Sequence, residues 1–256
     1  MSYQTIRYEK DDRGVVHVTL CRPEKHNAMN AEMIAELTDA ASTIAADEAC
    51  RVAVLAGEGR SFCAGGDLGW MKAQAARDRA GKIAEASALA TMLARWNALP
   101  RPVVGRVHGA AYGGGIGLVA ICDVVVAARN CRFALTETRL GLIPATIGPF
   151  VVGRMGEAFA RQVFFNARPF DADFLMRAGL VAGICDVEAL DEAVAVEVSH
   201  FLDCAPGAVV AAKRLCRQLA GGQPDDMATM TANALADRWE TAEAQQRIDA
   251  FFAGRS

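Results

Sequence analysis

The feature that most constrains how this chain folds is a run of glycines directly after a short apolar segment. Val103, Val104 and Val107 have the pattern of a short strand, and glycine fills positions 113, 114, 115 and 117 before the apolar stretch 118–122. A strand, then bare backbone, then a helix start would gather several free amides, a setting that favours an oxygen carrying negative charge. Such glycines also serve close packing, but their density here favours a backbone that faces a ligand.

The composition is that of an ordinary folded chain with no electrostatic signal for nucleic acid. At 256 residues, with 52% hydrophobic and 22% charged residues, the chain can bury the core of one large domain or of a domain with a small appendage. The formal net charge is -3, and no cluster of Lys and Arg offsets it. We therefore expect no nucleic-acid partner.

Cysteine usage and hydropathy predict a soluble, cytoplasmic protein. Eight cysteines occur without a Cys-x-x-Cys pair, which suits free thiols in a reducing compartment. The N-terminus has no apolar signal core, and the most apolar stretch, 118–128, is short and contains Asp123, so no membrane partner is expected. The four histidines have no metal-ligand spacing, and we expect no metal site.

Hydrophobic periodicity predicts an α/β fold that becomes helical toward its C-terminus. Apolar positions three and four residues apart indicate a helix after the N-cap residue Asn30 and another over 83–97, with Pro206 as the first residue of a later helix. Residues 227–252 have the pattern of one long helix or two short ones. The strand-like segments are 5–8 and 15–20, read as a hairpin, then 52–55, 103–107, 124–128 and 180–184.

The glycine run also matches a dinucleotide fingerprint, which would make the chain an NAD-dependent oxidoreductase. Gly115-Ile-Gly117-Leu-Val-Ala120 has the G-x-G-x-x-A form, and Glu137 follows about 20 residues later. In that motif the acid ends the second strand, where Arg129 and Asn130 stand here, and Asp123 leaves scarcely two turns of helix. We keep this interpretation only as a weak alternative.

A second glycine loop favours an oxyanion hole. Ala64-Gly65-Gly66-Asp67 and Gly113-Gly114-Gly115 each follow a strand-like segment, and each could offer one amide to the same oxygen. Two such donors stabilise an anionic transition state by about 3 kcal/mol each. The enolate of a thioester, formed when water adds to its conjugated double bond or when an α-proton leaves, is such an anion.

Several motifs together resemble the crotonase (enoyl-CoA hydratase/isomerase) superfamily in order and spacing. They run over most of the chain, from about Ile6 to Ile184, and are Arg22-Pro-Glu-Lys-His-Asn-Ala-Met-Asn, Ser61-Phe-Cys-Ala-Gly-Gly-Asp-Leu-Gly-Trp-Met, Arg101-Pro-Val-Val, His108-Gly-Ala-Ala-Tyr-Gly-Gly-Gly, Cys122-Asp123, Phe133-Ala-Leu-Thr-Glu-Thr-Arg-Leu-Gly-Leu-Ile-Pro and Arg177-Ala-Gly-Leu-Val.

The resemblance implies a crotonase-like spiral of ββα units, with the active site in a core over residues 1–195. A helical region, 196–256, would make subunit contacts in a homotrimer or homohexamer. The implied oxyanion donors are the amides of Gly66 and Gly114. The coenzyme A part of an acyl-CoA substrate would be bound by Lys25, Ala28, Ala64, Gly65, Asp67 and Leu68. No metal or redox cofactor is implied.

Glu137 resembles the second of the family's two catalytic glutamates, whereas Gly117 stands where the first is found. The non-catalytic alternative is that Glu137 is an ordinary glutamate on the surface or in the first turn of a helix. If it is catalytic, one carboxylate must serve as both base and acid, which syn addition of water permits. We expect an enoyl-CoA hydratase, with double-bond isomerisation, decarboxylation and non-catalytic acyl-CoA binding as alternatives.

The segments 67–71 and 137–147 are similar to bacterial methylglutaconyl-CoA and isohexenylglutaconyl-CoA hydratases of leucine and acyclic terpene breakdown. Such a substrate has a distal carboxylate, for which Arg139 is the candidate partner. Arg139 could equally pair with Glu137 or Glu157 on the surface.

Overall fold

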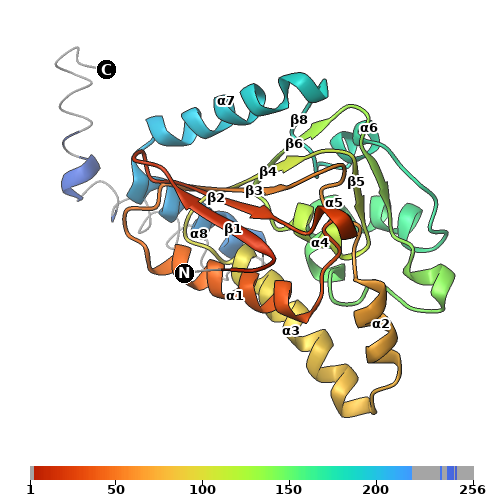
Figure 1. Cartoon of the computed structure of the whole chain (residues 1–256). Helices are drawn as coiled ribbons and strands as arrows, with labels where there is room; N and C mark the ends of the chain where they lie inside the picture. Colours follow the sequence, from red (N-terminus) through yellow and green to blue (C-terminus); the bar gives the residue numbers. More distant parts are fainter. Residues whose placement is uncertain (1–2, 221–236, 238–240, 245, 247–256) are drawn as a thin grey trace.

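The large sheet forms the centre of the fold (Figure 1). The computed structural model of the chain describes residues 3–220, 237, 241–244 and 246. Within them, six strands pair in the order β1-β2-β3-β4-β6-β8, with β1 antiparallel to β2 and the other pairs parallel. Their bounds are Ile6–Lys10, Val15–Leu20, Val52–Gly57, Val103–Val107, Val124–Ala128 and Gly183–Cys185. The predicted hairpin and buried strands are confirmed, except that the last strand starts three residues after the expected Leu180.

A small second sheet turns the chain into a spiral. β5 (Ala110–Tyr112) pairs with β7 (Arg132–Ala134), and isolated bridges add Cys63 beside β5 and Phe170 beside β7. The chain thus passes from β3 to Cys63, from β4 to β5 and from β6 to β7, each time from the large sheet to the small one. This repeated passage confirms the expected α/β spiral.

Helices cover both faces of the large sheet (Figure 1). α1 (Ala31–Ala46) begins where the Asn30 side chain accepts a hydrogen bond from the Met33 amide, as predicted, and packs against α3 (Arg79–Asn97). Trp96 of α3 is fully buried and donates its indole N–H to the Leu37 carbonyl of α1 at 2.8 Å. On the other face, α7 (Leu190–Asp203) packs on β4 and β6.

The remaining elements are short or lie at the edges. The helices among them are α2 (Leu68–Ala75), α4 (Gly114–Ala120), α5 (Gly148–Phe164), α6 (Ala172–Arg177) and α8 (Pro206–Ala220), with 3-10 turns η1 (Pro23–Lys25), η2 (Glu137–Leu140) and η3 (Val187–Ala189). α8 starts at the predicted Pro206. α4 has only seven residues, as the position of Asp123 required.

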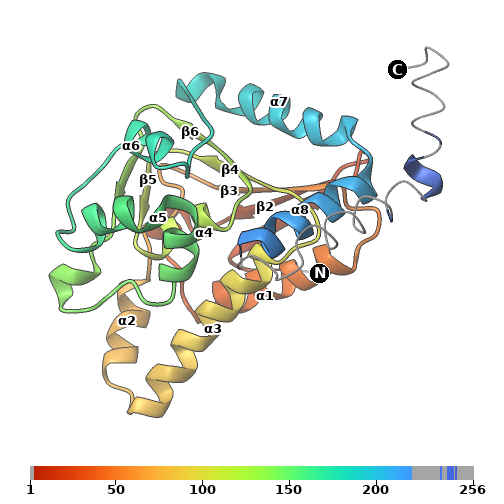
Figure 2. The same cartoon turned by 180° about the vertical axis from the view of Figure 1, so that it is seen from behind.

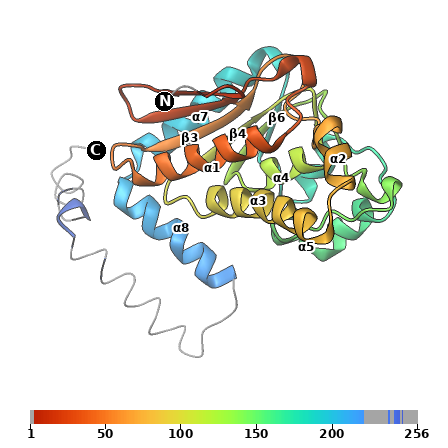
Figure 3. The ribbon, with the colours of Figure 1, turned by 60° about the horizontal axis from the view of Figure 1, so that its bottom comes forward.

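α8 returns to the side of the sheet that α1 and α3 cover (Figures 2 and 3). Lys213 holds it there, because its ammonium group lies 2.6 Å from the Asp123 carboxylate and 2.9 Å from the Arg101 carbonyl. The expected boundary between residues 195 and 196 falls inside α7, and the division into two regions stays a prediction. Most of the range 227–252, over which one long helix or two short ones are expected, lies outside the described residues.

No single helix in the described part of the chain is long and apolar enough to cross a membrane. Val187–Asp203 and Pro206–Ala220 reach that length and composition only as a pair, bent by 103°. Of the apolar side chains of α7, Leu190, Val194 and Val198 are buried within the fold, whereas Val196 is exposed.

Candidate active site

The two glycine loops predicted from the sequence meet in the structure. Gly65 has a φ of 92°, and a Cβ there would lie 2.8 Å from the Tyr112 carbonyl oxygen and 3.7 Å from the Gly114 amide nitrogen. The Tyr112 amide donates a hydrogen bond to the Cys63 carbonyl at 3.0 Å. The spiral therefore brings the end of one turn against the end of the next, and only a glycine leaves room for the approach at position 65.

Two backbone amides at this junction are left without acceptors. Beside Gly66, the Met29 amide donates to the Gly65 carbonyl at 2.7 Å and the Asp67 amide donates to the Met29 carbonyl at 2.8 Å, so the bridge does not use the Gly66 amide. Gly114 is the first residue of α4, where the helix supplies no acceptor for its amide. Among the described residues, neither amide has a hydrogen-bond acceptor.

Glu137 lies against the first glycine loop. It opens η2, and a Cβ on Gly113 would be 3.2 Å from its Oε1 atom. Its Oε2 atom is buried and has no hydrogen-bond partner within the described residues. Burial raises the pKa of the Glu137 carboxyl, and the residue's own backbone amide offsets this only in part. A carboxylate in this setting is poised to accept a proton.

These groups can perform proton transfer next to a thioester. Two free amides suit the oxygen of a thioester enolate, and the unpartnered carboxylate suits removal and return of a proton. No group of three His, Cys, Asp or Glu side chains in the described part of the chain could hold a metal ion.

The segment predicted to bind coenzyme A is held through Asn27 to the residues that lead into the second glycine loop. Asn27 is fully buried in the left-handed region, with a φ of 55°. Its side-chain amide donates to the Glu58 and Ser61 carbonyls, both at 2.8 Å, and its side-chain oxygen accepts from the Arg22 amide at 2.9 Å. The structure thereby brings Ala28, which is buried, and Ala64, which is half-buried, to the same junction, with Lys25 exposed at its edge.

Asp67 has structural partners that the sequence did not reveal. Its carboxylate accepts from the Gly69 and Trp70 amides at the start of α2 and lies 3.1 Å from the Arg22 guanidinium. These hydrogen bonds, the Trp70 amide foremost, together with the charge of Arg22, hold the pKa of Asp67 below its usual range. The next residue, Leu68, is 82% exposed and available to a ligand.

Trp70 and Met71 of α2 cover Gly66, which the sequence analysis did not anticipate. A Cβ on Gly66 would lie 3.2 Å from Met71 and 3.6 Å from Trp70. Helix α2 has no strong apolar periodicity, and the signal that marks it is the N-cap residue Asp67 just before it.

Arg139 lies apart from the carboxylates that were considered as its partners. It is exposed, and the described residues show no ion pair between it and Glu137 or Glu157. Glu157 pairs instead with Arg161, at 3.4 Å, one turn further along α5.

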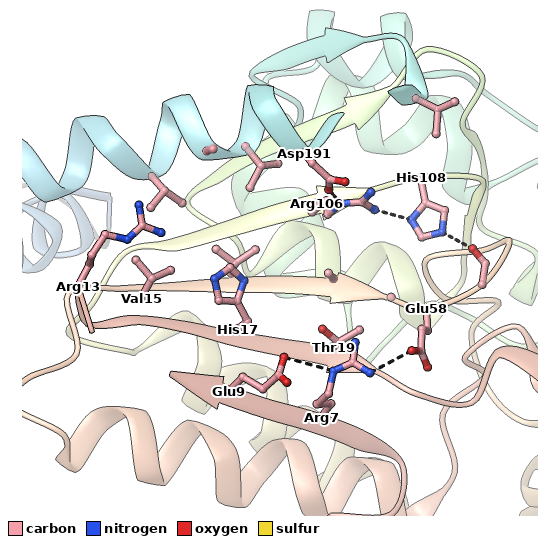
Figure 4. Close-up of a pocket in the computed structure, with 18 residues that line it drawn as sticks. Arg7, Glu9, Arg13, Val15, His17, Thr19, Glu58, Arg106, His108 and Asp191 are labelled. Carbon is pink, nitrogen blue, oxygen red and sulfur yellow. Dashed lines mark hydrogen bonds and ion pairs between the residues drawn. The ribbon is translucent and has the colours of Figure 1, made fainter. Parts of the chain in front are cut away.

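A cavity of about 630 Å³ lies elsewhere, between strands β1–β4 and α7 (Figure 4). Its charges neutralise one another, because Arg106 pairs with Asp191 at 2.5 Å and Arg7 pairs with Glu58 at 3.0 Å. His108 also lines it and bonds the Gly59 carbonyl, and burial lowers the pKa of this histidine. None of the residues predicted for catalysis or coenzyme A binding lines this cavity.

Comparison with known proteins points to one family. The family model described as enoyl-CoA hydratase/isomerase matches residues 10–255. A putative enoyl-CoA hydratase of Thermus thermophilus is 31% identical, with 98% of both chains covered. The mitochondrial Delta(3,5)-Delta(2,4)-dienoyl-CoA isomerase of Homo sapiens is 31% identical over 83% of this chain and 68% of its own length. The crystal structure of an enoyl-CoA hydratase from Shewanella pealeana superposes with a TM-score of 0.94 at 32% identity, covering 99% of this chain and 95% of that one.

Proposed function

Because the chain belongs to the enoyl-CoA hydratase/isomerase family, we propose that it adds water across the 2,3 double bond of an enoyl-CoA thioester. The observation that carries this proposal is the pairing of the Glu137 carboxylate, whose Oε2 atom is buried and has no partner among the described residues, with a glycine loop whose Gly114 amide has no acceptor there. Charge that develops on the thioester oxygen would be met by the amides of Gly66 and Gly114.

Each step of the addition then has a group to perform it. The Glu137 carboxylate takes a proton from water as the water oxygen bonds to the β-carbon, and the π electrons move toward the thioester carbonyl to form the enolate. The enolate then takes the proton back from Glu137 at the α-carbon, which restores both the thioester and the carboxylate. One carboxylate on one face of the substrate gives syn addition.

For the acyl group we propose a branched diacid of the 3-methylglutaconyl type. Arg139 supports this substrate, because it follows Glu137 by two residues, is exposed, and has no ion-pair partner within the described residues. A guanidinium can bind a distal carboxylate through two parallel hydrogen bonds. Arg139→Lys should then raise KM for the diacid thioester and leave KM for crotonyl-CoA unchanged.

The test follows the loss of conjugated thioester absorbance with crotonyl-CoA and 3-methylglutaconyl-CoA in parallel. We expect faster hydration of the branched diacid and loss of activity in Glu137→Gln. Equal rates on both substrates would refute the diacid preference alone. If neither absorbance falls with the wild-type protein, hydration of these acyl groups is wrong.

Double-bond isomerisation is the second candidate, favoured by the single carboxylate. Moving a proton between the α- and γ-carbons of a 3-enoyl-CoA needs one base and an oxyanion hole, and a dienoyl-CoA isomerase is among the relatives. A rise of conjugated absorbance from a 3-enoyl-CoA would identify this activity. Decarboxylation would instead release carbon dioxide from a malonyl-type thioester.

Two thermal-shift comparisons separate the remaining alternatives. Stabilisation by coenzyme A thioesters is expected, whereas stabilisation by NAD would favour an oxidoreductase. Stabilisation by the thioesters without turnover of any acyl group would identify a non-catalytic acyl-CoA-binding protein.

We propose further that the chain assembles as a homotrimer or homohexamer. Beside the site, Leu140, Leu142 and Ile143 are 61%, 53% and 73% exposed, an apolar cluster that a single chain leaves uncovered. Light scattering on the purified protein would give the mass of the assembly directly.

A further inference from the structure

The α-carbon of Gly117 is covered by two apolar side chains. A Cβ there would lie 2.5 Å from Cγ2 of Ile147 and 3.4 Å from Cδ1 of Leu93. The first distance is well below the roughly 3.5 to 4.0 Å at which carbon atoms pack. Ile147 is 2% exposed and Leu93 is fully buried, so neither has open space beside it. Glycine at 117 and isoleucine at 147 are therefore complementary.

This pair stands next to the reacting carboxylate along α4. Glu137 lies against Gly113, at the N-terminal end of α4, and Ile147 lies against Gly117. Gly113 is the residue just before α4, with a φ of 48°, and Gly117 is the fourth residue of that helix, about one turn further along. The Glu137 carboxylate and the Ile147 side chain thus lie against two glycines of the same run, about one helical turn apart.

The carboxylates that flank the two glycine loops, Asp67 and Asp123, are held by partners of their own. The helix α4 has no titratable side chain from 114 to 120. Asp67 of the second loop is held by Arg22 and two amides, and Asp123, just beyond α4, is held by Lys213 and the Val103 amide. Arg139, on the same turn as Glu137, is exposed, and no charged group contributes to the pKa of Glu137.

We propose that Ile147, which packs on Gly117, forms an apolar wall that leaves Glu137 as the only carboxylate of the described residues at the reacting carbons, so that both proton transfers of the addition pass through it. Ile147 is then a positioning residue. It fills the place from which a side chain at 117 would reach the substrate, and it holds the acyl carbons on the side of Glu137. This inference rests on the proposed hydration.

If Glu137 is the only carboxylate at the reacting carbons, the dependence of kcat/KM on pH has a distinctive form. With one carboxylate acting as base and then as acid, kcat/KM rises with pH through a single ionisation and then stays level. A second carboxyl group that had to be protonated would add a fall at higher pH.

The experiment compares the wild type with Ile147→Val, Ile147→Ala, Gly117→Glu and the double variant Gly117→Glu/Ile147→Ala, measuring Tm and the pH profile of kcat/KM. Ile147→Val should keep the level profile and stay within a few-fold of wild-type kcat/KM. Gly117→Glu should lower Tm by several degrees, because its Cβ meets Ile147. In the Ile147→Ala background, Gly117→Glu should lower Tm much less than it does in the wild type, because the clash with Ile147 is gone. Independent sites would show the same loss in both backgrounds. It should also acquire the fall at higher pH.

A bell-shaped profile for the wild type would overturn the proposal. So would a Gly117→Glu variant with unchanged Tm, or a double variant whose profile matches that of Ile147→Ala. If the wild type hydrates no enoyl thioester, the proposed function fails, while the coupling between 117 and 147 is still read from Tm. If Gly117→Glu does not fold and the double variant does, that contrast itself supports the pairing.

Discussion

Glu137→Gln separates a catalytic carboxylate from a structural one because it acts oppositely on activity and stability. General acid–base catalysis is typically worth a factor of about 10² to 10⁴, or about 3 to 5 kcal/mol of barrier. A buried polar atom without a partner costs about 1 to 3 kcal/mol. Because Glu137 is half-buried, we take the lower end, about 1 kcal/mol, which corresponds to about 2 to 4 °C in Tm at this chain length.

The stability effect depends on pH with a definite sign. Burial raises the pKa of Glu137 in the folded state above its unfolded value. The folded state therefore binds more protons in that range, and stability is lost as the pH rises from the unfolded pKa through the folded pKa. Glu137→Gln should raise Tm by about 2 to 4 °C at about pH 8 and by nothing at about pH 4, where the wild-type carboxyl is protonated.

The assay pairs hydration rates with thermal melts at both pH values. Glu157→Gln is the matched control, since that side chain is 78% exposed in a surface ion pair and should change neither quantity. A Glu137→Gln variant that melts several degrees lower at about pH 8 and still hydrates its substrate would refute the reasoning, because a structural glutamate would behave in that way.

Four further substitutions probe the site and the framework around it. Gly114→Ala should lower kcat, because a methyl group beside the Gly114 amide crowds the place proposed for the thioester oxygen, while Tm changes little, because that methyl group meets only the movable end of the Met29 side chain, at 2.4 Å. Gly115→Ala meets a backbone carbonyl at 2.4 Å and should mainly lower Tm. Asn27→Asp should cost about 2 to 4 kcal/mol in denaturant unfolding and raise KM, because it turns a donor toward two carbonyls into an acceptor; an unchanged midpoint would contradict this. Lys213→Met should cost about 2 kcal/mol, because it removes a largely buried charged hydrogen bond to Asp123; Tm equal to that of the wild type would show that α8 is held otherwise.

The sequence was sufficient to predict the elements with strong local signals. The helix after Asn30 has a cap residue and a regular apolar face, and the buried strands are short runs rich in β-branched residues. The strands β5 and β7 have three residues each and exist only because the spiral places them side by side. Their pairing is a tertiary fact that no local pattern contains.

The site was predicted in outline, and its supporting contacts were not. Glycine density and the motif around Glu137 indicated which backbone and which carboxylate to expect, and the structure brings them together. Two of the three side-chain hydrogen bonds of the left-handed residue Asn27 are made to a loop more than thirty residues away. Asp67 was predicted to bind coenzyme A, a role that is untested, yet its carboxylate already has partners at the start of α2.

The glycines of residues 113–117 do not all have the same role, so the run cannot be explained by packing alone or by ligand binding alone. At Gly115 a Cβ would meet the Cys63 carbonyl oxygen at 2.4 Å, and at Gly117 it would meet Ile147, so these two glycines serve close packing. At Gly113 the neighbour is the Glu137 carboxylate, and the amide of Gly114 has no acceptor within the described residues, so these two face the proposed reaction. Glycine is therefore required along this run for two different reasons, which are access to the proposed reaction at 113 and 114 and close packing at 115 and 117. Substitutions at 115 and 117 should therefore appear first in stability, and a substitution at 114 should appear first in turnover.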